Sequence, residues 1–146
     1  MDMYDEVCKK IRAFNRFYTV QMELLSSNYL GSDYSVTETR VLFEIKNHSG
    51  CLQSDIVKTM HIDKSYLSRI IRRFLACGLV EKNKCDGDKR AGKLSLTELG
   101  NAETDSLIAL TNSRITSQIS GLDRGECDAL SAALDTVISI LGKEEC

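Results

Sequence analysis

Apolar residues recur along this chain at steps of three and four, which is the spacing of one face of an α-helix. The first stripe predicts a long helix over residues 3–30, which the turn-forming residues 31–33 would end. The apolar positions of this stripe are Val7, Ile11, Phe14, Tyr18, Met22 and Leu25.

Three shorter helices are expected downstream. Thr37 is a candidate N-cap for the first, which ends within residues 47–50. The second covers residues 53–60, and Asp63 caps the third, which runs to Cys77. A turn of about three residues joins the last two helices, and this arrangement is typical of a helix-turn-helix.

The pattern then changes to that of a β-ribbon. Residues 79–84 are extended in character, 85–92 form a turn, and 93–97 alternate polar with apolar side chains. Two further helices are expected, one opening at residues 97–98 and the other following a break at 121–125.

These elements predict a mainly α fold with a minor β component: a winged helix-turn-helix with a two-stranded wing and helical regions at both ends. We expect a single domain over residues 1–146, with the winged-helix lobe at 35–97 and dimerisation helices at 3–30 and 98–142. The chain has 42% apolar and 27% charged residues, which is a globular composition. Neither a membrane span nor a signal peptide is apparent, so a cytoplasmic protein is expected.

The cysteines give no sign of a metal site. None of the six forms a C-x-x-C pair, and none has the spacing to His48 or His61 that a zinc site would require. We expect free thiols in a reducing compartment, with no metal and no cofactor. No nucleophile–base pair or phosphate-binding loop is present either, so no catalytic residue is assigned and an enzyme is not expected.

Charge is distributed unevenly along the chain. The net charge is −2, yet residues 64–93 hold nine cations against three acids, a local charge of +6, and the remainder carries −8. A basic block inside an acidic chain suggests a local anionic partner, although a solvated charged surface is the alternative.

The helix after Asp63 sharpens this interpretation. At 100° per residue its apolar side chains fall within one arc and face the core. Its remaining face combines small hydroxyls, an aromatic ring and arginines, with no acidic residue between Lys64 and Gly78. A merely solvated helix would favour lysine and glutamate there, whereas arginine can pair bidentately with guanine or hold a phosphate. We therefore expect this face to contact nucleic acid through Ser65, Tyr66, Ser68, Arg69, Arg72 and Arg73.

The turn of the wing adds a second basic element. Asp88 stands two residues before Arg90, with Lys89 between them. An arginine at a wing tip can enter a narrow minor groove, where the negative potential is enhanced. A neighbouring aspartate can hold its guanidinium by a charge-assisted hydrogen bond. Alone, D-x-R is a weak signal, but it follows a recognition-type helix here.

The segment DKSYLSRIIRRFLACGLV (63–80), followed by Asp88–Arg90 and LSLTELG (94–100), resembles the MarR family of transcriptional regulators. The resemblance implies an obligate homodimer that binds a pseudo-palindromic double-stranded DNA operator, often as a repressor released by a small molecule or an oxidant. Residues 12–45 look closest to the branch in which such a module precedes a GNAT acetyltransferase. A chain of this length leaves no room for that enzyme, so no acetyltransferase activity is implied.

Position by position, the resemblance implies a phosphate contact for Arg72, a wing arginine at Arg90 and an orienting acid at Asp88. The recognition-helix contacts that it implies are Ser65, Tyr66, Ser68 and Arg69. Two positions depart from the family pattern. His61 stands where glycine is usual, and Leu52 stands where a Ser or Thr usually caps the helix.

The terminal helices carry more apolar surface than a winged helix can cover. A two-fold dimer would bury it, whereas a monomer would have to fold these helices onto itself. The candidate dimer contacts are Val7, Ile11, Phe14, Leu134, Val137, Ile138 and Leu141.

Effector and redox chemistry stay open at this stage. Phe17, Tyr18 and Phe43 could line an effector site, although core positions are the commoner use of such residues. Cys8, and next Cys85, are candidates for a redox-sensing thiol, but the motif of known sensors is missing. A winged helix used for protein or RNA contact is the further alternative.

Overall fold

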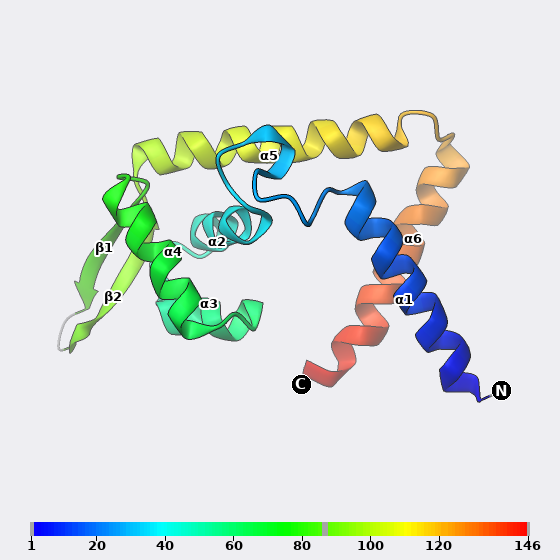
Figure 1. Ribbon diagram of the computed structural model, residues 1–146, viewed down its shortest axis with the longest axis horizontal. Coiled ribbons are helices and arrows are strands. Elements are labelled where there is room, and N and C mark those ends of the chain that lie inside the picture. The colour runs from blue at the N-terminus through cyan, green and yellow to red at the C-terminus, as the bar shows by residue number, and fades with distance from the viewer. Residues whose placement is uncertain (1, 86–87, 146) are drawn as a thin grey trace. The chain divides into compact units, whose positions relative to one another are not determined.

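The computed structural model describes the backbone of residues 2–85 and 88–145, and the side chains of 2–83 and 92–143. Figure 1 shows the helices of the chain and its one described antiparallel ribbon, which follows α4. None of the described helices is long and apolar enough to cross a membrane. The elements, in chain order, are α1 (Met3–Gln21), a 3-10 turn η1 (Tyr29–Gly31), α2 (Val36–Asn47), α3 (Gln53–Met60), α4 (Lys64–Ala76), β1 (Val80–Cys85), β2 (Asp88–Leu96), α5 (Glu98–Ile119), α6 (Arg124–Leu141) and η2 (Gly142–Glu145).

The chain forms two compact units, residues 1–110 and 111–146. The first contains the winged-helix lobe and its apolar core. As the periodicity predicts, α4 turns its apolar face into this core, where Phe74 and Leu67 are fully buried. The core members are Val41, Leu42, Ile45, Ile56, Leu67, Ile70, Ile71, Phe74, Leu79, Val80, Leu94 and Leu107.

The first helix is shorter than expected. It ends at Gln21 rather than continuing to residue 30, because Glu23 adopts a left-handed backbone with φ of 55°. Met22 is buried at this point, and Ser26 bonds locally to the backbone of Asn28. Serine side chains that bond to nearby backbone groups in this way compete with helical hydrogen bonds. The spacing of the apolar residues alone did not indicate this end of the helix.

The start of α2 also corrects the sequence prediction. Ser35, not Thr37, is the N-cap: its hydroxyl accepts from the Glu38 backbone N–H at 3.1 Å. The Glu38 carboxylate in turn accepts from the Ser35 N–H at 3.0 Å, which completes a capping box.

The two ends of α3 show both expected departures. His61 lies in the left-handed region, with φ of 51° and ψ of 39°. Leu52 precedes α3 and has no side-chain acceptor, so Asp55 accepts the Leu52 N–H at 2.9 Å as half of a capping box. At α4 the predicted cap is confirmed, because the Asp63 carboxylate accepts from the Tyr66 N–H at 2.9 Å.

A Schellman motif ends α4 and starts the ribbon. The N–H of Leu79 donates to the Phe74 carbonyl at 2.9 Å, and the N–H of Gly78 donates to Leu75 at 3.2 Å. Gly78 has a φ of 74°, which glycine adopts without a steric cost. This turn sends the chain directly from the exposed helix into β1.

The ribbon is a two-stranded antiparallel sheet, with Val80 opposite Leu96 and Lys82 opposite Leu94. Its base is attached to α5 through Thr97, whose hydroxyl donates to the Gly78 carbonyl at 2.6 Å and accepts from the Gly100 N–H at 3.0 Å. The helix after the break begins at Arg124, one residue before the expected break ends, and Asp123 caps it with Glu126.

Candidate nucleic-acid interface

The outward face of α4 carries the predicted contact residues. Ser65, Tyr66, Arg69 and Arg72 are exposed, and Ser68 is half-buried. The Arg69 guanidinium lies 5.6 Å from the centre of the Tyr66 ring. A cation–π contact of this kind restrains both side chains, so α4 presents a partly ordered basic surface. The N-terminal turn exposes Lys64, Ser65 and Tyr66, and the small Ser65 side chain allows a close approach to a ligand there.

Arg73 has a different environment from the other arginines. It forms an ion pair with Glu38 at the start of α2 and donates from Nη2 to the Asp33 carbonyl at 3.3 Å. Its guanidinium also lies 5.6 Å from the ring centre of Tyr34. The structure therefore turns Arg73 toward α2, and a DNA contact by this residue stays a prediction.

Tyr34 continues this packing into the lobe. Its ring meets Phe74 edge-on at 6.3 Å, and its hydroxyl donates to Glu103 Oε2 at 3.5 Å. Burial raises the pKa of Tyr34, and the nearby Glu103 carboxylate raises it further. Tyr34 thus remains neutral at ordinary pH and can keep its hydroxyl as a donor to α5.

Gln53 is a polar residue at this surface that the sequence patterns did not indicate. It opens α3 and contacts Ser68 on α4 and Lys82 on β1, each at 3.4 Å. The contacts bring together residues that are fifteen and twenty-nine positions apart in the sequence. Glutamine carries no charge and belongs to no motif here, so only the three-dimensional contact reveals it.

The wing-tip candidates lie at the limit of what the structure describes. Asp88, Lys89 and Arg90 belong to the backbone of β2, which pairs with β1. Their side chains lie outside the described residues. The roles assigned to them from the sequence therefore stay predictions.

All the predicted dimer contacts are exposed in the single chain. Their side chains range from 45% exposed for Leu134 to 70% for Ile138. On α1, Phe14 stacks on Tyr18 with ring centres 5.4 Å apart, so these two members of the apolar stripe pack on each other. Among the effector candidates, Phe17 and Tyr18 are exposed rather than core residues, while Phe43 packs against the core.

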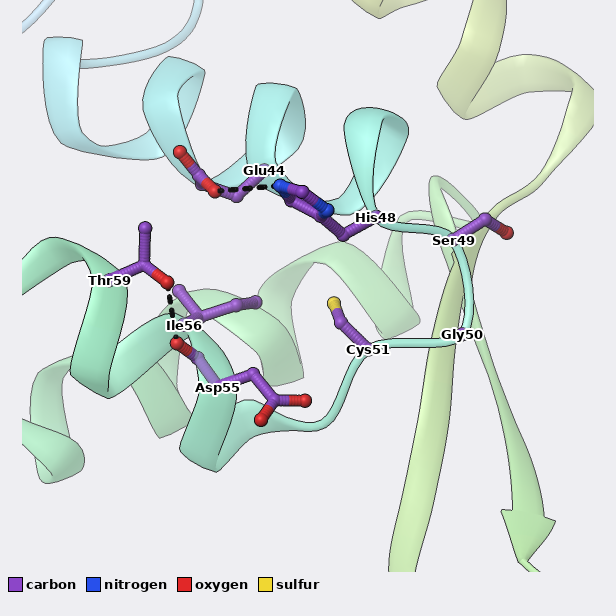
Figure 2. Close-up of a pocket in the computed structure, with 8 residues that line it drawn as sticks. All are labelled: Glu44, His48, Ser49, Gly50, Cys51, Asp55, Ile56 and Thr59. Carbon is purple, nitrogen blue, oxygen red and sulfur yellow. Dashed lines mark hydrogen bonds and ion pairs between the residues drawn. The ribbon is translucent and has the colours of Figure 1, made fainter.

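An open cavity of about 420 Å³ lies between the end of α2 and α3. In Figure 2 the Cys51 thiol points into the space between these helices, below the His48 ring. Burial raises the pKa of the Cys51 thiol, and the Asp55 carboxylate adds to this effect. The lining residues are Glu44, His48, Ser49, Gly50, Cys51, Asp55, Ile56 and Thr59.

The described cysteines, Cys8, Cys51, Cys77 and Cys127, are free thiols, and Cys8 and Cys77 are exposed. Within the part of the chain that the structure describes, no group of three or more His, Cys, Asp or Glu side chains could hold a metal ion. Cys85 and Cys146 lie outside the residues with described side chains.

The winged-helix lobe matches a known protein family. The family model of MarR covers residues 32–91, which run from the turn before α2 into β2. A comparison with curated proteins found no significant match.

Several solved structures share the fold over almost the whole chain. FabT of Streptococcus pneumoniae, in complex with DNA, is 16% identical, with a TM-score of 0.72 over 95% of this chain and 97% of that one. A mutant MarR from E. coli complexed with operator DNA is 23% identical, with a TM-score of 0.71 over 94% and 99%.

A putative MarR family regulator from Listeria monocytogenes, complexed with a 26mer DNA, is 20% identical, with a TM-score of 0.63 over 99% and 91% of the two chains. At these identities the likeness establishes the fold. The chain therefore has the fold of MarR-type winged-helix proteins, and its residues 32–91 form a winged helix that matches the MarR family.

Proposed function

We propose that this chain is a sequence-specific, DNA-binding transcriptional regulator of the MarR family. The outward face of α4 carries the proposal, because it presents Tyr66, Arg69 and Arg72 in a segment with no acidic residue from Lys64 to Gly78. DNA offers a dense row of phosphates to such a surface, and the base edges of its major groove admit one α-helix. Residues 32–91 match the MarR family, and three proteins with the same fold were solved with DNA, which supports the proposal further.

Each part of the α4 face has a proposed role. Ser65 and Tyr66 lie near the N-terminus of the helix, where small or flat side chains allow close approach to base edges. Arg69 is one turn further along and can pair through its planar guanidinium with guanine O6 and N7. Arg72 lies beyond it and would hold a phosphate. Phosphate contacts position the helix, while base contacts supply the sequence preference.

The wing would contribute from the side. Lys89 and Arg90 are proposed to enter the neighbouring minor groove, with Asp88 orienting the Arg90 guanidinium. Lys82 on β1 adds a further cation, whose ammonium donates to the Gln53 amide of α3.

We propose further that the chain acts as a homodimer. Exposed apolar stripes on α1 and α6 support this, since monomeric proteins rarely leave so much contiguous apolar surface in water. A two-fold dimer would place its recognition helices about one DNA turn (~34 Å) apart and so select a pseudo-palindromic operator.

We propose more specifically that the chain is a repressor, which a small molecule releases from DNA. Bound at an operator, the dimer would compete with transcription, and an effector with higher affinity for the DNA-free conformation would release it. The exposed rings of Phe17 and Tyr18 offer a surface for an aromatic effector. Such a regulator would work in the cytoplasm, and affiliation with the acetyltransferase-fused branch stays a prediction.

DNA binding over a salt series tests the central proposal. The wild-type chain should bind the region upstream of its own gene at ~0.15 M salt at least ~10³-fold more tightly than a random duplex of equal length. Its affinity should fall steeply as salt rises, because binding releases counterions. Equal binding to both duplexes at all salt concentrations would contradict sequence-specific regulation. Binding to RNA but not to DNA would support a winged helix that contacts RNA.

Release by an oxidant is a second candidate mechanism, and the exposure of Cys8 on α1 favours it. A sensing thiol must be accessible, and Cys8 meets that condition. Peroxide should then release DNA from the wild-type chain but not from Cys8→Ser, with Cys77→Ser as the matched exposed-thiol control. Unchanged release from Cys8→Ser would exclude Cys8 as the sensor.

A further inference from the structure

The first residue of α3 joins the two elements that are proposed to contact DNA. Gln53 Nε2 donates to Ser68 Oγ on α4 at 3.4 Å, and Gln53 Oε1 accepts from Lys82 Nζ on β1 at 3.4 Å. Figure 1 shows α3 beside α4, and contacts join α4 in turn to β1. Because Ser68 is half-buried and Lys82 exposed, the bridge lies at the edge of the proposed DNA-binding face.

The chemistry of Lys82 decides how the Gln53 amide is oriented. An ammonium group can only donate, so the end of the amide that faces Lys82 must be the carbonyl oxygen. The amide nitrogen then faces α4 and donates to Ser68. Ser68 Oγ accepts this bond, which leaves its own hydroxyl hydrogen for an acceptor outside the lobe. In a major groove such acceptors are purine N7, guanine O6 and thymine O4.

Because Gly92 has no side chain, Lys82 can extend across it to reach Gln53. Lys82 pairs with Leu94 across the ribbon, which makes Gly92 its diagonal neighbour on the same face. The aliphatic stem of Lys82 lies over this glycine: a Cβ at position 92 would come within 2.3 Å of Lys82 Cγ and 2.4 Å of Cε. A side chain at position 92 would therefore displace the stem and draw the ammonium away from Gln53.

We propose that Gln53 is a positioning residue for DNA recognition, which, with Lys82 lying over Gly92, holds Ser68 as a hydrogen-bond donor toward a base. This inference rests on the proposed DNA-binding function. Gln53, an uncharged residue of α3, would contribute to the sequence preference by acting through Ser68 on α4. The overall attraction to phosphate does not depend on it.

A double-mutant cycle on Gly92 and Lys82 tests the bridge. Gly92→Ala should displace a flexible side chain at little cost in stability, yet break the contact with Gln53. In a Lys82→Ala background the stem is absent, so adding Gly92→Ala should change nothing further. Gly121→Ala is the matched control, because a Cβ at position 121 meets no atom within 4 Å.

The readout is the ratio of Kd values for a random duplex and for the upstream region, at one salt concentration. Loss of one well-placed hydrogen bond to a base should lower this ratio about 5- to 10-fold. The same loss is expected for Gly92→Ala, for Lys82→Ala and for the double variant. Loss of a lysine charge alone would weaken binding to both duplexes and leave the ratio unchanged. Gln53→Met, similar in length but without the amide, should show the lower ratio with an unchanged urea midpoint.

Four outcomes would overturn the proposal. In the free protein, Gly92→Ala should shift the side-chain amide NMR signals of Gln53, and unmoved signals would show that the bridge does not form. Additive effects of Gly92→Ala and Lys82→Ala on the ratio, or an unchanged ratio in Gln53→Met, would overturn the positioning role while leaving the proposed function standing. A wild-type chain that does not distinguish the two duplexes would overturn the proposed function, and this role with it.

Discussion

Arg73 on α4 forms an ion pair with Glu38, the residue that also closes the capping box at the start of α2. The two carboxylate oxygens serve different partners: Oε1 accepts the Ser35 N–H, and Oε2 meets the guanidinium. One side chain thus fixes where α2 begins and ties that point to the last turn of α4. Because Tyr34 lies beneath the same guanidinium, Arg73 acts as a structural joint of the lobe.

Loss of the Arg73–Glu38 ion pair should lower the stability of the lobe. The Glu38 side chain is only 13% exposed, so Arg73→Ala would leave a largely buried carboxylate without its cation. We expect a loss of about 1–2 kcal/mol in the free energy of unfolding, measured by urea denaturation. Arg72→Ala, on the exposed face of the same helix, should cost less than about 0.5 kcal/mol. Equal stabilities of the two variants would contradict the joint.

Arg69 and Arg72 should affect DNA binding in different ways. Arg69→Ala should lower the preference for the upstream region by about 1–3 kcal/mol, because a base contact is lost. Arg72→Ala should weaken binding to all duplexes alike and reduce the slope of log K against log salt by about 1. Fluorescence anisotropy on both duplexes over a salt series measures both quantities. A uniform loss in Arg69→Ala would assign that residue to phosphate instead.

His61 offers a test of backbone strain. It is exposed and adopts φ of 51°, a conformation that costs most residues roughly 1 kcal/mol. His61→Gly should therefore raise the urea midpoint, with a gain of about 0.5–1 kcal/mol. His61→Ala keeps the steric cost and should bring no gain. A destabilised glycine variant would show that the histidine side chain contributes more than the strain removes.

The apolar stripe on α1 should control the oligomeric state. Sedimentation of the wild-type chain should give twice the chain mass of 16.3 kDa at micromolar concentration. Phe14→Glu places a charge in the stripe and should shift the protein toward monomer. Arg16→Glu changes the charge of the same helix outside the stripe and should leave the dimer intact. A monomeric wild-type chain with full DNA affinity would contradict the dimer.

Most of the winged-helix lobe follows from local sequence signals. The bounds of α3, the Asp63 cap and the buried face of α4 were all predictable, because periodicity and capping depend on residues a few positions apart. The end of α1 was not, since the stripe continues through Leu25 while the backbone turns at Glu23. Ser35 and Thr37 are both acceptable caps by residue type, and the S-x-x-E spacing from Ser35 to Glu38 is the sequence signal that distinguishes them.

In the candidate site, too, local sequence patterns predicted some features, and only the folded structure showed the others. A helical wheel placed Arg69 and Arg72 outward, and both are exposed. The same wheel placed Arg73 on the flank of the outward face. The partners of Arg73 are Glu38 and the Asp33 carbonyl, which lie outside α4, so no spacing along α4 can reveal them. Gln53 was missed for the same physical reason, because its importance comes from contacts with two other elements.

Hydroxyl-radical footprinting of the upstream region tests the central claim most directly. A dimer that reads DNA with two copies of α4 should protect two patches of related, inverted sequence, with centres about one helical turn (~10 bp) apart. Protection should be lost in Arg69→Ala at a concentration where the wild-type chain saturates the site. A single unsymmetrical patch, or protection without any preferred position, would contradict the account.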